Sequence, residues 1–530
     1  MPARRGWWIP PAGLVLVYLY SFPYLEKIRN ANELPRIYLV HAIVDRGALD
    51  IDAECRRWGG VVDTAVYGGR TFSNKAPGLS FAGVPVYAAL KRLHGLAGRA
   101  PPTLREETYF LRLLCVTLPQ LAFLLVLWRL SGRFSQDPVA RRLVVLGYAL
   151  GTLALPFSLL YIAHEPATVL IGCAFYLLVG AAPAWRLVLA GLCAGAAVLV
   201  EYQAAFFALP LLAYAMVTVR PVGRLGFAVL GALPPAGALA AYHRACFGSI
   251  WRTAYPYSTS PAYRALHQQG LLGLTHPTWR HFFDGFLAPG NGLFVLAPWL
   301  VLGLVGLWLL LRARAPRGPR NREALLCAAM LLTAVWFLSS FLFAGPGWHG
   351  WEIGPRYIAI AVPFFALPSA RAFERARAHS GLAIGAAALL FSSVVLHVGA
   401  SLTFPLWPDK LWNPVVELAW PLLRDGFAPY NLGRLVGLPG RLQLWPAFAV
   451  ALALVLWALP GARVRVVAAV LGCALLLLFW LAPRTPSPDS VGVARWIESI
   501  WEPPPAQPPP AQQPPAPAQA AHPPPPPALR

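Results

Sequence analysis

Long apolar runs alternate with short polar segments along most of this chain. Many of the runs hold about 17 to 25 residues, the length that an α-helix needs to cross the hydrocarbon core of a bilayer. The pattern therefore predicts an all-α integral membrane protein with about 13 transmembrane helices. We expect these helices near residues 7–25, 106–129, 143–162, 166–183, 187–202, 203–219, 225–243, 291–311, 324–344, 357–370, 381–403, 445–460 and 466–483.

The apolar block from Pro77 to Leu90 decides the predicted topology. It is short, begins at Pro-Gly and ends in Lys91 and Arg92, so we interpret it as an interfacial or re-entrant helix. If this block does not cross the membrane, the grouped arginines, including the run RARAPRGPRNR at 312–322, all lie on one face of the membrane. An excess of arginine is typical of cytoplasmic loops. The N-terminus is then cytoplasmic, and the long outer segments are 26–105, 245–290 and 404–444.

The composition changes near the C-terminus and divides the chain into three parts. A polytopic membrane domain at 1–483 contains the large first outer loop, 26–105, in which we expect juxtamembrane helices. Residues 503–530 are mostly Pro, Ala and Gln, which predicts a disordered tail on the outer side. Between them, 484–502 has four apolar side chains at helical spacing, which predicts a short amphipathic helix on the membrane surface: Val493, Trp496, Ile497 and Ile500.

Charge and cysteine content narrow the class of protein further. A net charge of +22 would suggest a nucleic-acid partner in a soluble protein, but this chain is 57% hydrophobic and its arginines lie between apolar runs. We therefore predict no nucleic-acid partner and a multi-pass protein of a cytoplasmic membrane. The seven cysteines show no metal-ligand spacing. Only Cys55 and Cys246 fall in predicted outer loops, where two unpaired thiols are favoured over a bridge.

Polar residues are concentrated between Asn32 and Gly78, in NELPRIYLVHAIVDRGALDID and GGRTFSNKAPG. Glu33 follows the first predicted span after a short linker, so its carboxylate should lie at the outer membrane boundary. Apolar surroundings raise the proton affinity of a carboxylate, which suits a general base that accepts a proton from a hydroxyl nucleophile. The alternative is that Glu33 only pairs with Arg36 on a loop helix.

Lys75 and Arg356 each stand at the outer mouth of an apolar element. A cation at headgroup level is what a phosphate or diphosphate lipid requires, and arginine offers a bidentate fork. Arg36, in the first predicted outer loop, is a further candidate for phosphate binding. The alternative is an interfacial residue that snorkels to water. Arg112 lies inside the outer turn of a span, where an unpaired charge is costly, so we expect it to pair with Glu106 or Glu107.

Two further groups of residues could contact substrate or metal. Trp348 and His349 suit a sugar ring, although such tryptophans also form interfacial aromatic belts. His164 and Glu165 close the loop after the third predicted span and, with Glu33, could hold a divalent metal. The alternative is that Glu165 complements the dipole of the helix that follows. No organic cofactor is expected.

The order of one span, then NELPRIYLVHAIVDRGALDID, then GGRTFSNKAPGLSFAGVPVYAAL, then a span with YFLRLLCVTLP resembles the polytopic GT-C glycosyltransferases. The similarity is greatest to the protein O-mannosyltransferase and lipid A aminoarabinose transferase branch. It covers the N-terminal two-fifths and extends more loosely to PGNGLFVLAPW and WHGWEIGPRYIAIAVPF. The resemblance implies transfer of a sugar from a polyprenyl-phosphate carrier, usually with inversion, to a protein, lipid or glycan hydroxyl on the outer face.

The resemblance also implies residue roles. Glu33 matches the position of the catalytic carboxylate, and Lys75 matches the basic residue that helps to hold the donor phosphate. His164 and Glu165 match the polar or acidic site of the second outer loop. Where many relatives have two acids, this chain has Asn32 before Glu33. Asparagine cannot act as a base at neutral pH, so that role falls to Glu33.

Two other classes of function fit the same sequence. A transporter or flippase of a lipid-linked sugar would share the spans and the headgroup cations, but it should have ionisable groups near the midplane or broken, repeated helices. Here the acids cluster at one face, which favours an enzyme. A non-catalytic scaffold that binds a partner through the proline tail is the third interpretation. The sugar and the acceptor are not specified by the sequence.

Overall fold

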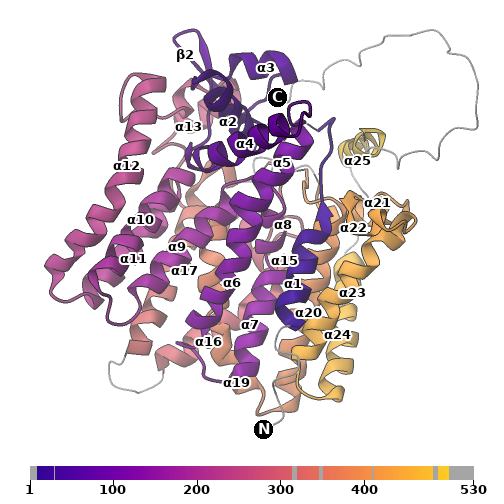
Figure 1. Cartoon of the computed structure of the whole chain (residues 1–530). Helices are drawn as coiled ribbons and strands as arrows, with labels where there is room; N and C mark the ends of the chain where they lie inside the picture. Colours follow the sequence, from indigo (N-terminus) through magenta and orange to yellow (C-terminus); the bar gives the residue numbers. More distant parts are fainter. Residues whose placement is uncertain are drawn as a thin grey trace, which may run out of the picture.

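The structure, a computed structural model, describes residues 9–28, 30–312, 319–344, 350–408, 411–481 and 488–500. Helices stand side by side in a bundle, with a layer of shorter helices across one end (Figure 1). Helices satisfy their backbone hydrogen bonds internally, which is what a lipid environment demands. Among the described residues, five helices are long and apolar enough to cross a membrane: Leu104–Ser131, Val222–Phe247, Asn321–Ser340, Ser380–Thr403 and Gly440–Ala458.

Each predicted apolar run contains helix, which confirms the all-α membrane architecture. The bundle consists of α1 (Ile9–Tyr20), α5 (Leu104–Arg112) continued through η1 (Leu113–Thr117) into α6 (Leu118–Ser131), α7 (Pro138–Leu150), α9 (His164–Leu178), α10 (Ala184–Val200), α11 (Ala204–Thr218), α12 (Leu225–Phe247), α16 (Val301–Arg312), α17 (Pro319–Ser340), α20 (Ser380–Thr403), α23 (Trp445–Ala458) and α24 (Ala462–Leu481).

The run predicted as one helix at 357–370 is broken into short pieces. They are η6 (Arg356–Ala361), α18 (Val362–Ala366) and α19 (Ser369–Ala376). Pro363 lies in the first turn of α18 and Pro368 immediately precedes α19. Proline lacks the N–H that would continue a helix, so it interrupts the run at these points. The total of about 13 crossings therefore stays a prediction.

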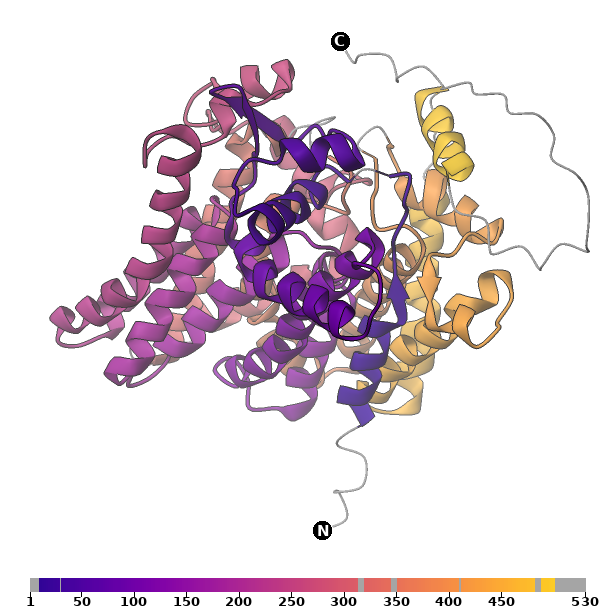
Figure 2. The same ribbon diagram turned by 45° about the horizontal axis from the view of Figure 1, so that its top comes forward.

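The first predicted loop folds into a layer over the bundle end, and we refer to it as the loop layer. It contains α2 (Leu34–Arg46), α3 (Asp52–Trp58), the hairpin of β2 (Thr64–Tyr67) with β3 (Arg70–Ser73), and α4 (Gly78–Leu96). α2 begins with Pro35 in its first turn and ends at Gly47, whose φ of 62° is left-handed. The block predicted as an interfacial helix is α4, which lies across the bundle end (Figures 1 and 2).

The other segments predicted to face outside lie at this same end. Figure 1 shows α13 (Pro261–His267) beside the loop layer, and α21 (Trp420–Arg424) and α22 (Leu432–Leu435) lower, just above α23. The predicted amphipathic helix is α25 (Pro488–Ile500), and it packs on protein as well: Trp496 lies edge-on to Trp351, with ring centroids 5.7 Å apart, and Ile497 is buried. The predicted tail at 503–530 lies outside the described residues. Cys55 and Cys246 are both free thiols.

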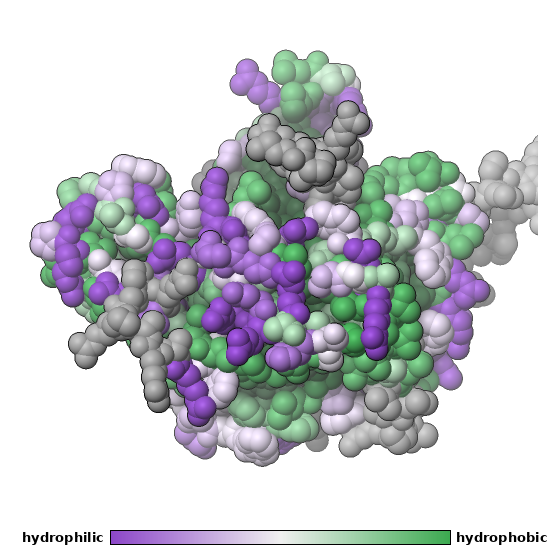
Figure 3. All heavy atoms as spheres, turned by 90° about the horizontal axis from the view of Figure 1, so that it is seen from below, coloured by the Kyte–Doolittle hydropathy of each residue, from purple (hydrophilic) through white to green (hydrophobic). Residues whose placement is uncertain are grey.

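The opposite end of the bundle carries several of the grouped arginines that the structure describes, among them Arg133, Arg371 and Arg377. Viewed from that end, hydrophilic side chains gather across the middle of the face and hydrophobic ones surround them (Figure 3). Three acids at this end each contact an arginine: Glu323 with Arg133 at 2.9 Å, Glu374 with Arg371 at 3.0 Å, and Asp137 with Arg377. The remaining arginine charge at this end is what the positive-inside pattern expects of a cytoplasmic face.

Two glycines let α4 press closely onto its neighbours. A Cβ placed on Gly78 would lie 2.7 Å from the backbone carbonyl of Leu199, at the end of α10. A Cβ on Gly83 would collide with the hydroxyl oxygen of Tyr161 and would lie 2.9 Å from a methyl group of Val40 in α2. These close contacts hold the loop layer against the end of the bundle.

We expect Gly78→Leu to destabilise the protein by about 1–3 kcal/mol, because backbone cannot move aside for the added side chain. Thermal unfolding of the purified protein in detergent measures the loss. Gly95→Ala, in the same helix, is the matched control because nothing lies within 4 Å of its added Cβ. Equal unfolding temperatures for the two variants would contradict this account of the packing.

Candidate functional site

Charged and polar side chains from distant segments meet beneath the loop layer. Burial of an unpaired charge is expensive, so the pairing of each group shows how the site is organised. The members come from the loop layer, the first turn of α9, the end of α10, the span α5 and the segment 350–357: Asn32, Glu33, Arg36, Asp63, Lys75, Arg112, His164, Glu201, Glu352, Arg356 and Tyr357.

Glu33 is only 4% exposed, and its carboxylate is gripped by Arg112. The Arg112 Nε donates to Oε1 at 2.8 Å and Nη2 donates to Oε2 at 2.7 Å. The backbone N–H of Tyr161 also donates to Oε1, at 2.5 Å, and the Asn30 amide donates to Oε2 at 3.2 Å. This fork of charge-assisted bonds sets the position and orientation of the carboxylate.

The predicted pairing of Arg112 with Glu106 or Glu107 is therefore wrong. Glu106 instead completes a capping box with Thr103, and Glu107 contacts the imidazole of His41. On a helix, only residues three or four apart face one another, and these acids precede Arg112 by six and five positions.

The alternative that Glu33 pairs with Arg36 is also wrong. Arg36 turns towards Glu201 at the end of α10, with Nη2 3.9 Å from Oε2. Glu33 and Arg36 are thus held by different helices of the bundle, which anchors the start of α2 at two points.

Glu352 organises a second buried network. Its Oε1 accepts hydrogen bonds from the Asn32 amide and from Arg356 Nη1, the latter at 2.9 Å, while Oε2 lies 3.3 Å from His164 Nε2. Burial by itself would raise the pKa of Glu352, but the Arg356 charge, the neighbouring His164 and the hydrogen bond from Asn32 lower it to about 2. The amide of Asn32 thus donates a hydrogen bond to the Glu352 carboxylate. An acid at position 32 would instead place a second negative charge beside Glu352.

Arg36, Lys75 and Arg356 place three cations near one another. Lys75 Nζ lies 2.6 Å from Asp63 Oδ2. Burial lowers the pKa of Lys75, the charge of Asp63 raises it, and the nearby charges of Arg36 and Arg356 lower it again. Lys75 is therefore close enough to both guanidinium groups to be affected by their charge.

Several buried N–H donors of these cations have no hydrogen-bond partner within the described part of the chain. They are Nε and Nη1 of Arg36, which is 1% exposed, and Nε of Arg356. The other Arg356 donors reach Glu352 and the Tyr357 hydroxyl, the latter at 2.6 Å. A buried guanidinium with unsatisfied donors is costly, so an anion that accepts these bonds would be stabilised.

A cavity of about 590 Å³ opens on the other side of Glu33. Its wall contains Glu33 and Arg112 together with the chain at 23–28, α2, α3 and the start of α5. Tyr24, Lys27 and Trp58 line it, so the cavity offers both polar and apolar contacts. Glu33 therefore separates an open cavity from the buried network of its neighbour Asn32.

The predicted metal ligands do not come together. Glu33 is held by Arg112, while Glu165 accepts a hydrogen bond from the Tyr148 hydroxyl at 2.6 Å. His164 lies instead between Glu201 and Glu352, and Glu352 is already neutralised by Arg356. Across the described ranges, no group of three His, Cys, Asp or Glu side chains is arranged to hold a metal ion. The residues present therefore do not fit the three-ligand metal site.

Sequence reasoning placed Lys75, Arg356, Arg36 and His164 as candidates, and the structure gathers them in one region. Trp348 and His349 lie outside the described residues. Reasoning from the sequence missed Asp63 and Glu201 as members of the site. Glu201 could have been found, because an acid between two apolar runs, in VLVEYQAAF, is costly unless it has a role. Asp63 has no such signal among the many charges of its loop.

No family model matches this chain, and no curated protein matches it. Among solved structures, the chain is similar to ArnT from Cupriavidus metallidurans in the apo state, with 17% identity and a TM-score of 0.47, over 89% of this chain and 78% of that one. The structure of the same protein bound to undecaprenyl phosphate is 16% identical, with a TM-score of 0.46, over the same shares of the two chains. Arabinosyltransferase EmbB from Mycobacterium smegmatis is 12% identical, with a TM-score of 0.41, over 92% of this chain and 40% of that one.

We expect Arg112→Gln to destabilise the protein by about 3–5 kcal/mol, because it leaves the buried Glu33 carboxylate without its partner. The double variant Glu33→Gln with Arg112→Gln should lose less than the single variant. Chemical or thermal unfolding of both variants measures this coupling. Arg99→Gln removes an arginine that is 64% exposed and serves as the control. Additive losses in the double variant would show that the pair does not form.

Proposed function

We propose that this chain is a membrane glycosyltransferase that moves a sugar from a polyprenyl-phosphate donor to a hydroxyl group of a protein, lipid or glycan. The reaction would take place on the outer face of the bacterial inner membrane, with the loop layer outside. One observation carries the proposal: buried cations with unsatisfied donors and a carboxylate that lines an open cavity lie within one site beneath the loop layer.

The cations form the donor side of the proposed site. A polyprenyl-phosphate sugar carries its anionic phosphate at the membrane boundary, with the lipid in the bilayer. Arg36 and Arg356 would donate to phosphate oxygens through N–H groups that otherwise lack partners, and Lys75 would add a point charge. Trp348 and His349, as expected from the sequence, would contact the sugar.

The cavity forms the acceptor side, and Glu33 lies at its boundary with the donor side. In the proposed step, an acceptor hydroxyl in the cavity attacks the anomeric carbon of the sugar. The bond from that carbon to the phosphate oxygen breaks, polyprenyl phosphate leaves with the electron pair, and Glu33 accepts the hydroxyl proton. Attack from the side opposite the leaving phosphate inverts the configuration. Arg112 would orient the carboxylate for this role.

The second candidate is a transporter or flippase of a lipid-linked sugar. The broken helices η6, α18 and α19 fit such a protein, because transporters often use discontinuous helices. However, the cations and acids of this site lie beneath the loop layer rather than midway along the bundle, where a transport pathway places them. The two functions differ in outcome, because only a transferase releases polyprenyl phosphate.

Replacement of Glu33 by Gln should lower sugar transfer by at least about 100-fold, because the base is lost. The protein is reconstituted with a panel of polyprenyl-phosphate sugars, and released polyprenyl phosphate is measured. Glu33→Gln also leaves the buried Arg112 without its ion-pair partner. The double variant with Arg112→Gln should therefore recover stability without recovering transfer. Glu26→Gln, in the same cavity wall but 71% exposed, should keep full transfer. Full transfer by Glu33→Gln would remove Glu33 from the role of base.

Lys75→Gln should weaken donor binding about tenfold, since one charge-assisted contact to phosphate is lost. The dependence of the initial rate on donor concentration measures the change as a higher KM. Lys91→Gln is the matched control, because Lys91 also pairs with an aspartate, at 2.7 Å, but is 46% exposed on α4. An unchanged KM in Lys75→Gln would place the phosphate elsewhere.

A further inference from the structure

An apolar groove with arginine at one end lies on a different part of the molecule from the site described above. It has a volume of about 480 Å³ and is formed by α20, η7 (Val415–Ala419), α21, η8 (Gly440–Leu444), α23 and α24. None of the residues assigned to the glycosyl-transfer site lines it. The groove is therefore separate in space from the proposed glycosyl-transfer site.

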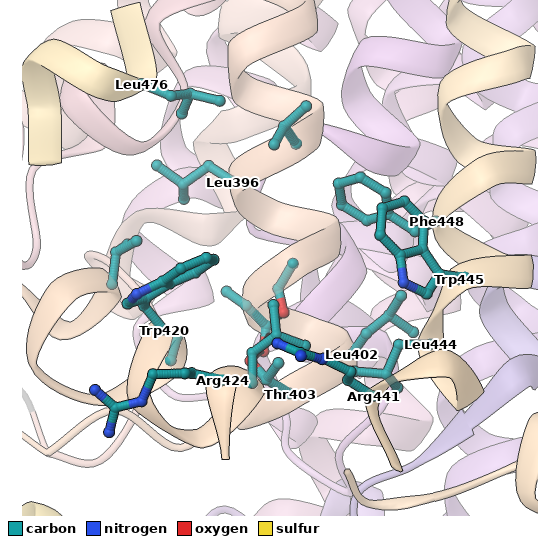
Figure 4. Close-up of a pocket in the computed structure, with 16 residues that line it drawn as sticks. Leu396, Leu402, Thr403, Trp420, Arg424, Arg441, Leu444, Trp445, Phe448 and Leu476 are labelled. Atoms are coloured by element: carbon teal, nitrogen blue, oxygen red, sulfur yellow. Dashed lines mark hydrogen bonds between the residues drawn. The ribbon is translucent and has the colours of Figure 1, made fainter. Parts of the chain in front are cut away.

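The groove is polarised along its length. Figure 4 shows Leu396 and Leu476 at one end, and Thr403, Arg424 and Arg441 at the other. The arginine end belongs to the loop-layer end of the bundle, where α21 and α22 lie in Figure 1. An apolar length that ends in positive charge complements a lipid chain that ends in an anionic headgroup.

The two arginines differ in how far their charge is neutralised. Arg424 forms a bidentate pair with Asp425, from Nε to Oδ1 at 2.7 Å and from Nη2 to Oδ2 at 2.8 Å. For the Arg441 guanidinium, no ion pair or hydrogen bond is present among the residues that the structure describes. The positive charge available to a ligand at this end of the groove is therefore mainly that of Arg441.

Two tryptophans mark the depth of the groove in the membrane. Trp420 and Trp445 line it and are 50% and 57% exposed. Large exposed indoles are typical of the boundary between hydrocarbon and headgroups, where an apolar ring with one N–H group is favoured. This places Arg441 at headgroup level and the leucine end of the groove in the hydrocarbon core.

We propose that this groove binds one anionic phospholipid of the bilayer. One acyl chain would lie along Leu396 and Leu476, and the phosphodiester would accept hydrogen bonds from Arg441. A lipid with a choline headgroup presents a second, positive charge near Arg441, so it should bind more weakly. The bound lipid would join α20 to α23 and α24 at the edge of the bundle.

Native mass spectrometry of the delipidated full chain, with added phosphatidylglycerol or phosphatidylcholine, tests the proposal. We expect one phosphatidylglycerol to be retained in preference to phosphatidylcholine. Arg441→Gln should lower the phosphatidylglycerol affinity about tenfold, because one charge-assisted contact is lost. Arg434→Gln is the matched control, because Arg434 lies on α22 above the ring of Tyr430 and does not line the groove.

A second variant tests the chain-binding part without removal of charge. Gly399 lines the groove and has nothing within 4 Å of an added Cβ, so Gly399→Phe should fill the groove without disturbing α20. It should abolish retention of phosphatidylglycerol while the unfolding temperature of the lipid-free protein stays the same. If Arg441→Gln does not fold, this variant decides the question.

Three results would overturn the proposal. They are equal retention of the two phospholipids, equal loss of affinity in Arg441→Gln and Arg434→Gln, and displacement of phosphatidylglycerol by an equimolar amount of undecaprenyl phosphate. The last result would show that the groove serves the carrier lipid instead. Because sugar transfer is not measured in this experiment, failure here would leave the transferase proposal unaffected.

Discussion

The structure of the site depends on the cost of burying charge. Glu33 and Arg112 are both buried, and neither could stay there without the other. Their pair joins the first residue before α2 to the span α5, while Arg36 joins the same helix to the end of α10 near Glu201. The start of α2 is thereby tied to two separate parts of the bundle.

Once α2 is held in place, the two sides of the site acquire different chemistry. On one side, Asn32 reaches Glu352, and the cations Arg36, Lys75 and Arg356 come near one another. On the other side, a cavity reaches the Glu33 carboxylate. A reaction that transfers a group from an anionic carrier to a hydroxyl requires this separation, because the leaving phosphate and the acceptor proton need opposite kinds of partner. The close approach of Gly78 to the backbone of α10 holds α4 against the bundle beside the site.

The bilayer explains why the polar groups lie where they do. Apolar helices leave little room for charge within the bundle, so ionisable groups collect at the two ends. At one end, arginines contact the acids Glu323 and Glu374, and at the other, acids and cations form ion pairs such as Lys75 with Asp63 and Arg356 with Glu352. The groove that contains Arg441 follows the same rule, since its charge lies at its headgroup end and its length is apolar.

The sequence by itself determined the all-α membrane architecture, the helix α4 across the bundle end, the helix α25 and the candidates Lys75, Arg36, Arg356 and His164. Run length and local periodicity carry this information, because a helix in lipid must satisfy its own backbone. Only the tertiary structure decided the partners. Arg112 pairs with Glu33 instead of Glu106 or Glu107, and Asn32 meets Glu352 across 320 positions. A buried charge pairs with whichever opposite charge helix packing brings within reach, and that distance is not encoded in neighbouring positions of the chain.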